Sequence, residues 1–363
     1  MNYPLKIRQV CFFILAFFPI VKIFMMPSIL AGFANEDMWI SSLINLVIDF
    51  ITLLFIISLC KRAKTNFFGL LEQNFGRIAS KIILSLYFIC FMLKAIVPLN
   101  EQKDYVVLTL YTLIPHKIYF LPIFFVAFYL CLKPLRVLGR AADILWIFSL
   151  IGIILLMALS IPNAQLDAIF PVGANSFTSI LRGSYSTLNW NGDIIYLIFF
   201  IGNFKYESKS TLKIIISFLI SSLLVILFMI IFYSIFTSIG FRQRFALTEV
   251  SKYTAVINNI GRFDYFGIIF ILFSSVFAVI LPMYFASKLL TLICSFKKKW
   301  ISSLIVVLIQ AFILIFLTEY YLGIESFMKN FGGAIFLVFS NILPIIFSIF
   351  FKRGVKNEIN AKG

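Results

Sequence analysis

The sequence predicts an all-α polytopic membrane protein. Of its 363 residues, 62% are hydrophobic and 13% are charged, whereas an ordinary soluble domain is about half apolar and about a quarter charged. Apolar runs recur along the whole chain, and each is long enough to cross a bilayer core of about 30 Å. Short clusters of lysine and arginine separate these runs, as expected for loops on the cytoplasmic side of a membrane.

Five helices are predicted in the first half of the chain, where basic or turn-forming residues bound the apolar runs. The first run is too long and too irregular for a cleaved signal peptide. The third contains Pro98, where a bend is expected. The fourth and fifth are separated by a basic connection that begins at Lys133. The predicted helices cover residues 10–33, 39–60, 78–113, 118–132 and 141–161.

Five further helices are predicted after an outer loop, residues 162–182, which mixes turn formers with apolar residues and is expected to pack on the outer face. A second outer segment, residues 240–264, is also expected not to span. The eighth helix contains Pro282, which predicts a kink. The predicted helices cover residues 183–204, 212–239, 265–294, 300–322 and 333–351.

The basic residues predict the orientation of this bundle. With both termini cytoplasmic, the inner segments hold twenty lysines and arginines and the outer segments hold eight. Residues 1–363 are thus expected to form a single transmembrane domain. It divides into a first repeat over residues 8–161 and a second over 183–352, with a short cytoplasmic tail at 353–363. Three lysines, Lys22, Lys94 and Lys288, remain inside the membrane.

The same observations exclude several classes of function. The charge of +16 lies in loops between apolar runs, so it indicates the membrane and not nucleic acid as the partner. The five cysteines have no metal-type or redox-type spacing, and there is a single histidine. Glycine-rich phosphate loops and the G-x-S-x-G motif are lacking. We therefore expect no catalytic residues, no metal and no cofactor, which leaves binding or transport.

Polar interruptions fall in the first helix of each predicted repeat. Helix one contains Pro19, Lys22 and Pro27, and helix six contains the stretch NWNGD at 189–193. Interruptions at matching places in two inverted halves indicate a binding site near the bilayer midplane, where half-helix ends offer amide donors and carbonyl acceptors. The candidate ligand-binding residues are Ile20, Val21, Lys22, Ile23, Asn189, Asn191, Gly192 and Asp193.

The intramembrane charges are expected to have partners, because an ionisable group at mid-bilayer is costly. Lys22 and Asp49 each lie ten residues from the outer end of their antiparallel helices, so both are about 15 Å deep, and we predict that they contact directly or through water. The pair has two readings: it pins two helices together, or it holds a ligand or replaces a cation. Asp193 caps a half-helix, contacts ligand, or does both. Lys94 either pairs with Asp193 or extends toward the membrane surface.

Four stretches, taken in order, resemble a known family. They are MMPSIL in helix one, IPNAQLDAIFPVG after helix five, NWNGD in helix six and VINNIGRFDYFGIIFILF before helix eight. With the ten-helix count, they resemble the spore-germination receptor B-subunit family, within the amino acid–polyamine–organocation transporter superfamily. Residues 27–30 match the family's Pro-Ser-Ile-Leu, and Gly192–Asp193 match a glycine followed by an acidic residue, usually glutamate.

The resemblance implies a leucine-transporter-type fold of two inverted five-helix repeats, with helices one and six unwound. It also implies a subunit of a nutrient-germinant receptor in the spore inner membrane. Such a subunit binds a small, amino-acid-like nutrient and works with an A-type subunit and a lipoprotein C-type subunit. Where the family often has Gly-Ser-Ala in helix one, this chain has Ile20, Val21 and Lys22, which hinders close backbone approach to a ligand.

Two rival functions fit the same sequence. A secondary amino-acid permease of this fold accumulates its substrate in proteoliposomes under a proton or sodium gradient, whereas a receptor subunit binds without accumulating it. A structural member of a membrane complex binds nothing itself. In that case, substitution of Asn189, Asn191 or Asp193 leaves any ligand response unchanged, while loss of the chain abolishes the complex.

Overall fold

The computed structural model describes residues 5–63, 65–105, 121–253, 264–316, 327 and 331–351, and in these ranges the regular elements are helices. Six helical stretches among them are long and apolar enough to cross a membrane. They are Met26–Arg62, Phe67–Tyr105, Leu135–Asn163, Ser210–Arg242, Ser275–Cys294 and Gly333–Phe350. The chain is therefore a multi-pass membrane protein whose described regular elements are helices, as the composition predicts.

The first predicted helix is interrupted, but at a different place from the one expected. Helix α1 (Ile7–Ile23) runs through Pro19 and ends one residue after Lys22. Helix α2 (Met26–Ala34) begins after a bend at Phe24 and Met25 and has Pro27 in its first turn, where a proline lacks no helical hydrogen bond. The candidate residues Ile20–Ile23 thus form the last turn of α1 and not the break itself.

The next two helices complete this side of the bundle. Helix α3 (Met38–Arg62) matches the predicted segment 39–60 closely. Helix α4 (Phe67–Tyr105) begins well before the predicted residue 78, and its kink lies at Gly76, with φ 76° and ψ 172°. Only glycine adopts this backbone region readily. A bend is expected at Pro98, but the backbone of α4 departs from helical geometry at Gly76 and not at Pro98, which lies within the helix.

The sixth predicted helix is divided into short pieces. After α6 (Leu121–Leu132) and α7 (Leu135–Ser160) come two short 3₁₀ turns and then α8 (Phe177–Ser186), so the end of the predicted outer loop 162–182 is helical. A 3₁₀ turn, η5 (Leu188–Trp190), and α9 (Ile195–Phe200) follow, separated by the non-helical residues 191–194. The interruption thus coincides with NGDI, where the polar residues predict it.

The remaining elements follow the predicted order. They are α10 (Ser210–Phe236), η6 (Thr237–Arg242), α11 (Ala246–Lys252), α13 (Asp264–Cys294), α14 (Lys299–Phe316), α16 (Gly333–Leu337), the π-helical turn η8 (Val338–Ile342) and α17 (Leu343–Phe350). Helix α11 lies within the predicted outer segment 240–264. Parts of the predicted helices 78–113, 118–132 and 300–322, and the tail 353–363, lie outside the described residues.

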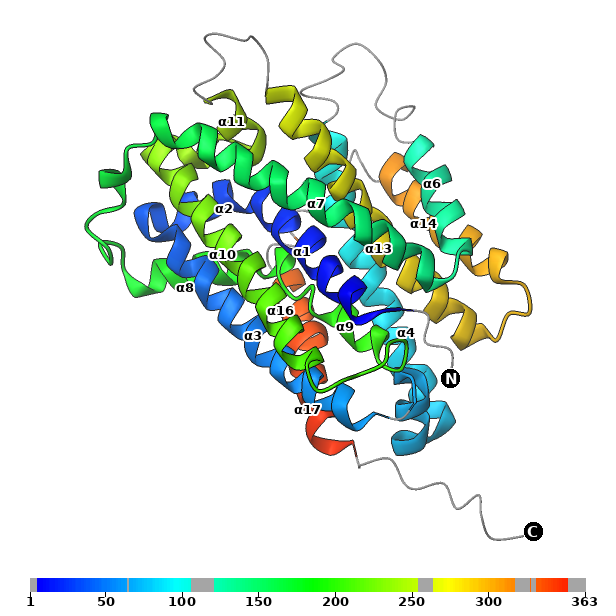
Figure 1. Cartoon of the computed structure of the whole chain (residues 1–363). Helices are drawn as coiled ribbons and strands as arrows, with labels where there is room; N and C mark the ends of the chain where they lie inside the picture. Colours follow the sequence, from blue (N-terminus) through cyan, green and yellow to red (C-terminus); the bar gives the residue numbers. More distant parts are fainter. Residues whose placement is uncertain are drawn as a thin grey trace, which may run out of the picture.

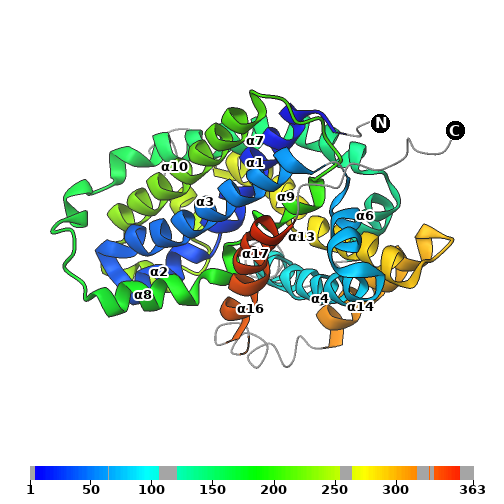
Figure 2. The ribbon, with the colours of Figure 1, turned by 90° about the horizontal axis from the view of Figure 1, so that it is seen from below.

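Helix α1 lies at the centre of the bundle and places the candidate site there. It packs along both α7 and α10, and α13 packs along α4. From Val10 to Ile23, every residue of α1 except Phe12 is buried. Figure 2 shows α2, α3 and α10 on one side and α4, α6 and α14 on the other, with α9 and α16–α17 between them. In Figure 1 the α13–α14 connection lies at the right and the α7–α8 connection lies at the left.

Candidate functional site: a buried ion cluster

A buried ion cluster joins α1, α4 and the gap between η5 and α9. The Asp193 carboxylate lies 3.0 Å from Lys22 Nζ and 2.9 Å from Lys94 Nζ. The side chain of Asp193 has no exposed surface, and those of Lys22 and Lys94 are 1% and 6% exposed. Inside a bilayer an ionised group needs a partner, and here one carboxylate serves two ammonium groups. Lys94 therefore pairs inward with Asp193, one of the two arrangements left open by the sequence.

The break after η5 frees backbone groups, and these form hydrogen bonds with the charged side chains of the cluster. Asn191 is extended, and Gly192 has a φ of 73°. The Asn191 carbonyl accepts a hydrogen bond from Lys94 Nζ at 2.9 Å, and the Gly192 N–H donates to both carboxylate oxygens of Asp49 at 3.2 Å. Charged side chains thus satisfy the backbone groups that the break frees, which an apolar surrounding could not do.

A second acidic group, Asp49 on α3, lies on the other side of Gly192. It is 1% exposed and accepts a hydrogen bond of 3.0 Å from Asn341 Nδ2. The same amide nitrogen donates to Thr52 Oγ1 at 3.0 Å. Asn341 belongs to the π-helical turn η8, a distortion that occurs frequently at functional sites. The α16–η8–α17 segment is thereby joined to α3 and to the break after η5.

We predict a contact between Lys22 and Asp49, direct or through water; the ion-pair partner of Lys22 is instead Asp193, at 3.0 Å, and a contact through water stays a prediction. Asp49 is hydrogen-bonded to Gly192, the residue preceding Asp193. The prediction rested on equal depth in two antiparallel helices. Depth fixes the height of a side chain but not the direction it takes around its helix, and the break in helix six placed another carboxylate nearer.

The cluster is balanced in charge. Two lysines, Lys22 and Lys94, and two aspartates, Asp193 and Asp49, lie around the break after η5. Each lysine nitrogen also lies over an aromatic ring, 5.2 Å from the centroid of Phe18 and 5.3 Å from that of Phe336. Buried ions are tolerated when they are paired and further hydrogen-bonded, whereas removal of one partner is strongly destabilising. The four groups therefore behave as a unit.

The two interrupted segments meet at this unit. Asn191 Nδ2 donates to the Thr187 carbonyl at 3.0 Å and contacts the sulfur of Met26, the first residue of α2, at 3.7 Å. Asn189 is 4% exposed and lies on η5. The other candidates on α1, Ile20, Val21 and Ile23, are buried apolar residues of the core. Of the predicted set, the structure thus gathers Lys22, Asn191, Gly192 and Asp193 around one point, together with Asp49 and Lys94.

Several polar residues of this region carry no clear sequence signal. Asn341 and Ser340 lie in an apolar run, where an isolated SN pair resembles ordinary helix packing. Glu101, on α4, accepts a hydrogen bond from Trp190 Nε1 of η5 and is 6% exposed. Glu101 lies close to the end of α4 (Phe67–Tyr105), where a charged residue in the sequence alone does not indicate a buried role. In each case the partner comes from a distant segment, so only the fold reveals the role.

The arrangement offers fixed charges and hydrogen-bond donors to a small charged group. Because Lys22 and Asp193 are almost completely buried, such a group can reach them only by displacing a partner. In the described part of the chain, no three histidine, cysteine, aspartate or glutamate side chains gather as metal ligands would. A charged group that enters this site would therefore have to replace one of the existing ion-pair partners.

Ser340 allows a test of whether the buried polar groups of this region have their hydrogen bonds. Its hydroxyl is buried and has no hydrogen-bond partner, so Ser340→Ala is expected to raise the free energy of unfolding by up to about 1–2 kcal/mol. Ser184→Ala is the control, because Ser184 Oγ donates to Asn45 Oδ1 at 2.6 Å, and it should be destabilised by about 1 kcal/mol. Thermal unfolding midpoints in detergent measure both, and destabilisation of Ser340→Ala would contradict this account.

Comparison with known proteins supports the resemblance noted in the sequence. The family described as spore germination protein matches residues 4–323, which include α1, α3, α4 and the break after η5, and hence Lys22, Asp49, Lys94 and Asp193. No curated protein matches the chain. Since the matched residues make up most of the 363-residue sequence, the chain belongs to the spore germination protein family.

Proposed function

We propose that the chain is the integral-membrane subunit of a nutrient-germinant receptor in the spore inner membrane. In this proposal it has ten spanning helices in two inverted repeats, residues 8–161 and 183–352, and both termini are cytoplasmic. It binds a small, amino-acid-like nutrient and triggers germination together with an A-type subunit and a lipoprotein C-type subunit. It catalyses no reaction of its own.

One observation carries the proposal: two interrupted segments, α1–α2 and η5–α9, meet at a buried and charge-balanced cluster. In proteins that bind small solutes within the membrane, discontinuous helices supply the ligand's partners. Here Asp193 lies at 3.0 Å from Lys22 and 2.9 Å from Lys94, and Gly192 brings the backbone against Asp49. Together with the family membership, this favours a ligand site over a purely structural ion pair.

The charges indicate the kind of ligand. A zwitterion brings one cation and one anion, so it can replace the Lys22–Asp193 contact without leaving a net charge in the bundle. Its carboxylate would then face a lysine, and its ammonium group would face Asp193 or Asp49. A ligand with a single charge would leave one buried group unpaired, which costs about 3–5 kcal/mol. The amino-acid-like nutrient fits this balance.

The proposal predicts where the protein occurs and what accompanies it. A tagged copy, purified in parallel from spores and from growing cells of its host, is expected only in spore membranes, together with two further proteins, one of them lipid-modified. If the chain is abundant in growing cells and is purified alone, the receptor proposal fails. Substrate accumulation in proteoliposomes under an ion gradient would then identify a permease.

A further inference from the structure

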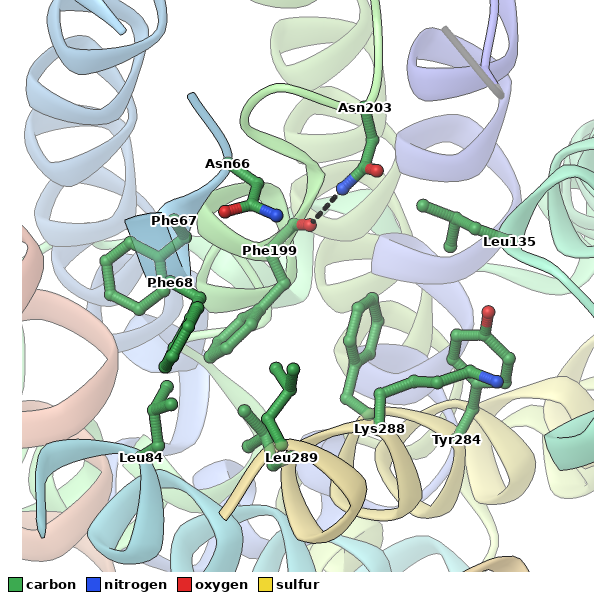
Figure 3. A pocket seen from close by; sticks show the side chains of 12 residues that line it. Asn66, Phe67, Phe68, Leu84, Leu135, Phe199, Asn203, Tyr284, Lys288 and Leu289 are labelled. Carbon is green, nitrogen blue, oxygen red and sulfur yellow. Dashed lines mark hydrogen bonds between the residues drawn. The ribbon is translucent and has the colours of Figure 1, made fainter. Parts of the chain in front are cut away.

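Two neighbouring cavities lie where the α3–α4 connection meets the end of α9, outside the ion cluster. The smaller has a volume of about 210 Å³ and lies between the start of α4, the end of α9, and α13 (Figure 3). The larger, of about 750 Å³, lies between residues 60–69 and residues 201–206. Asn66 and Asn203 line both. A volume of about 300–1,000 Å³ is typical of sites that hold organic ligands.

The smaller cavity has apolar walls. Figure 3 shows Phe68 of α4, Phe199 of α9 and Leu289 of α13 around the hollow. Leu292, one turn further along α13, also lines it and is 41% exposed, so the cavity reaches the outside of the bundle. In a membrane protein, an apolar cavity that opens to the outside of the helix bundle is suited to a hydrocarbon chain.

The larger cavity is polar and basic. Lys61 and Lys205 line it, and the hydroxyl of Thr65, which also lines it, is buried without a hydrogen-bond partner. Lys205 lies 3.7 Å from Glu207, but both side chains are largely exposed, and such surface pairs are weak. Among the described residues that line the two cavities, three are lysines and none is aspartate or glutamate. The third, Lys288, donates to the Cys131 carbonyl at the end of α6.

The two connections that form these walls are held closely together. Gly202 has a φ of 76°, and a Cβ at this position would lie 2.7 Å from the Cα of Asn66 and 2.9 Å from the Thr65 carbonyl oxygen. In addition, the Leu5 N–H donates to the Asn203 carbonyl at 3.0 Å. The polar and apolar cavities therefore share one fixed boundary, formed by Asn66 and Asn203.

We propose that this pair of cavities binds an anionic phospholipid, with its headgroup in the larger cavity and an acyl chain in the smaller. The lysines supply charge complementarity, and basic pockets between membrane helices are known to hold acidic lipid headgroups. A free phosphate would use only the polar cavity and would leave the adjoining apolar one without an occupant. The site lies at the end of the bundle that the basic residues predict to be cytoplasmic.

The experiment follows the thermal unfolding midpoint of the purified full-length chain in a mild non-ionic detergent during lipid titration. Phosphatidylglycerol is expected to raise the midpoint saturably. Phosphatidylcholine with the same acyl chains, and inorganic phosphate, are expected to raise it far less. Each lysine strengthens attraction to anionic lipid about five-fold, so Lys61→Gln/Lys205→Gln should weaken apparent phosphatidylglycerol binding about 30-fold. Leu292→Trp, which fills the apolar opening, should weaken it too.

The control is Lys297→Gln/Lys298→Gln, which removes two exposed lysines of the α13–α14 connection that line neither cavity. It should weaken phosphatidylglycerol binding far less than Lys61→Gln/Lys205→Gln does, because neither lysine lines a cavity. Three results would each overturn the proposal: equal effects of the two lipids, an equal effect of inorganic phosphate alone, or an equal loss in the control variant. The first would indicate acyl-chain binding without charge, the second a free-anion site, and the third general surface attraction.

Discussion

Asp193→Leu is expected to lower the free energy of unfolding by about 3–5 kcal/mol, a large fraction of the roughly 5–15 kcal/mol that holds a typical protein folded. The substitution leaves the ammonium groups of Lys22 and Lys94, both within 3.0 Å of the Asp193 carboxylate, without that partner. It also leaves the buried site with an excess of positive charge. The measurement is the folded, monodisperse fraction after detergent extraction, together with the unfolding midpoint.

Two further variants separate this effect from simple loss of a carboxylate. Lys22→Met/Asp193→Leu restores charge balance between Lys94 and Asp49, so it should recover part of the lost stability. Glu207→Leu removes an ion pair with Lys205 in which both side chains are largely exposed, and should cost less than about 1 kcal/mol. Equal stability of Asp193→Leu and Glu207→Leu would show that Asp193 is not the centre of the cluster.

The same variants address ligand binding. If the cluster only pins helices together, Lys22→Met/Asp193→Leu protein that folds will retain its germinant response in spores. If the cluster contacts ligand, the response will be lost although the protein is present in the spore membrane. The folded fraction thus measures the structural role of the charged residues, and the response in spores measures their role in ligand binding.

The apolar pattern predicts helix positions well where a run is bounded by charges. Helix α3 (Met38–Arg62) differs from the predicted segment 39–60 by one or two residues, because basic residues end the run. The pattern fails where a helix begins in a stretch of mixed polarity. Residues 67–76 of α4 combine apolar residues with Glu72, Gln73 and Asn74, so no apolar run marks the start of the helix at Phe67. The kink at Gly76 is not predicted either, because a single glycine in the sequence does not reveal its φ.

The sequence predicts the charged residues of the cluster but not how they pair. A charged residue inside a membrane helix is conspicuous in any sequence, so Lys22, Lys94, Asp49 and Asp193 could be identified at once. Their contacts depend on the rotation of each helix and on where helix one bends, and the bend at Phe24–Met25 has no polar residue to mark it. The sequence does not indicate the role of Asn341, because the π-helical turn that directs it toward Asp49 depends on packing.

Gly192 is a position in the break after η5 where a side chain is poorly tolerated. Its φ of 73° is unfavourable for any residue with a side chain, and a Cβ there would lie 2.5 Å from the Cβ of Ser340 and 2.8 Å from its Oγ. A separation below 3.0 Å forces one of the two segments to move. Movement of either segment would lengthen the hydrogen bond from the Gly192 N–H to Asp49 or that from Asn341 to Asp49.

Gly192→Ala is therefore expected to destabilise the protein by about 2–5 kcal/mol. About 1–2 kcal/mol of this comes from the positive φ, and about 1–3 kcal/mol comes from overpacking against η8. Gly192→Ala/Ser340→Gly removes the clash but keeps the φ, so it should recover roughly the overpacking part. Unfolding midpoints in detergent measure the three proteins.

Gly76→Ala provides the matched control, because Gly76 has a φ of 76° but a Cβ there would meet nothing within 4 Å. Its expected loss is that of backbone strain alone, about 1–3 kcal/mol. If Gly192→Ala loses no more than Gly76→Ala, and the added Ser340→Gly restores nothing, then η8 does not press on the break after η5. The link from α16–α17 to the ion cluster would then rest only on the hydrogen bond between Asn341 and Asp49.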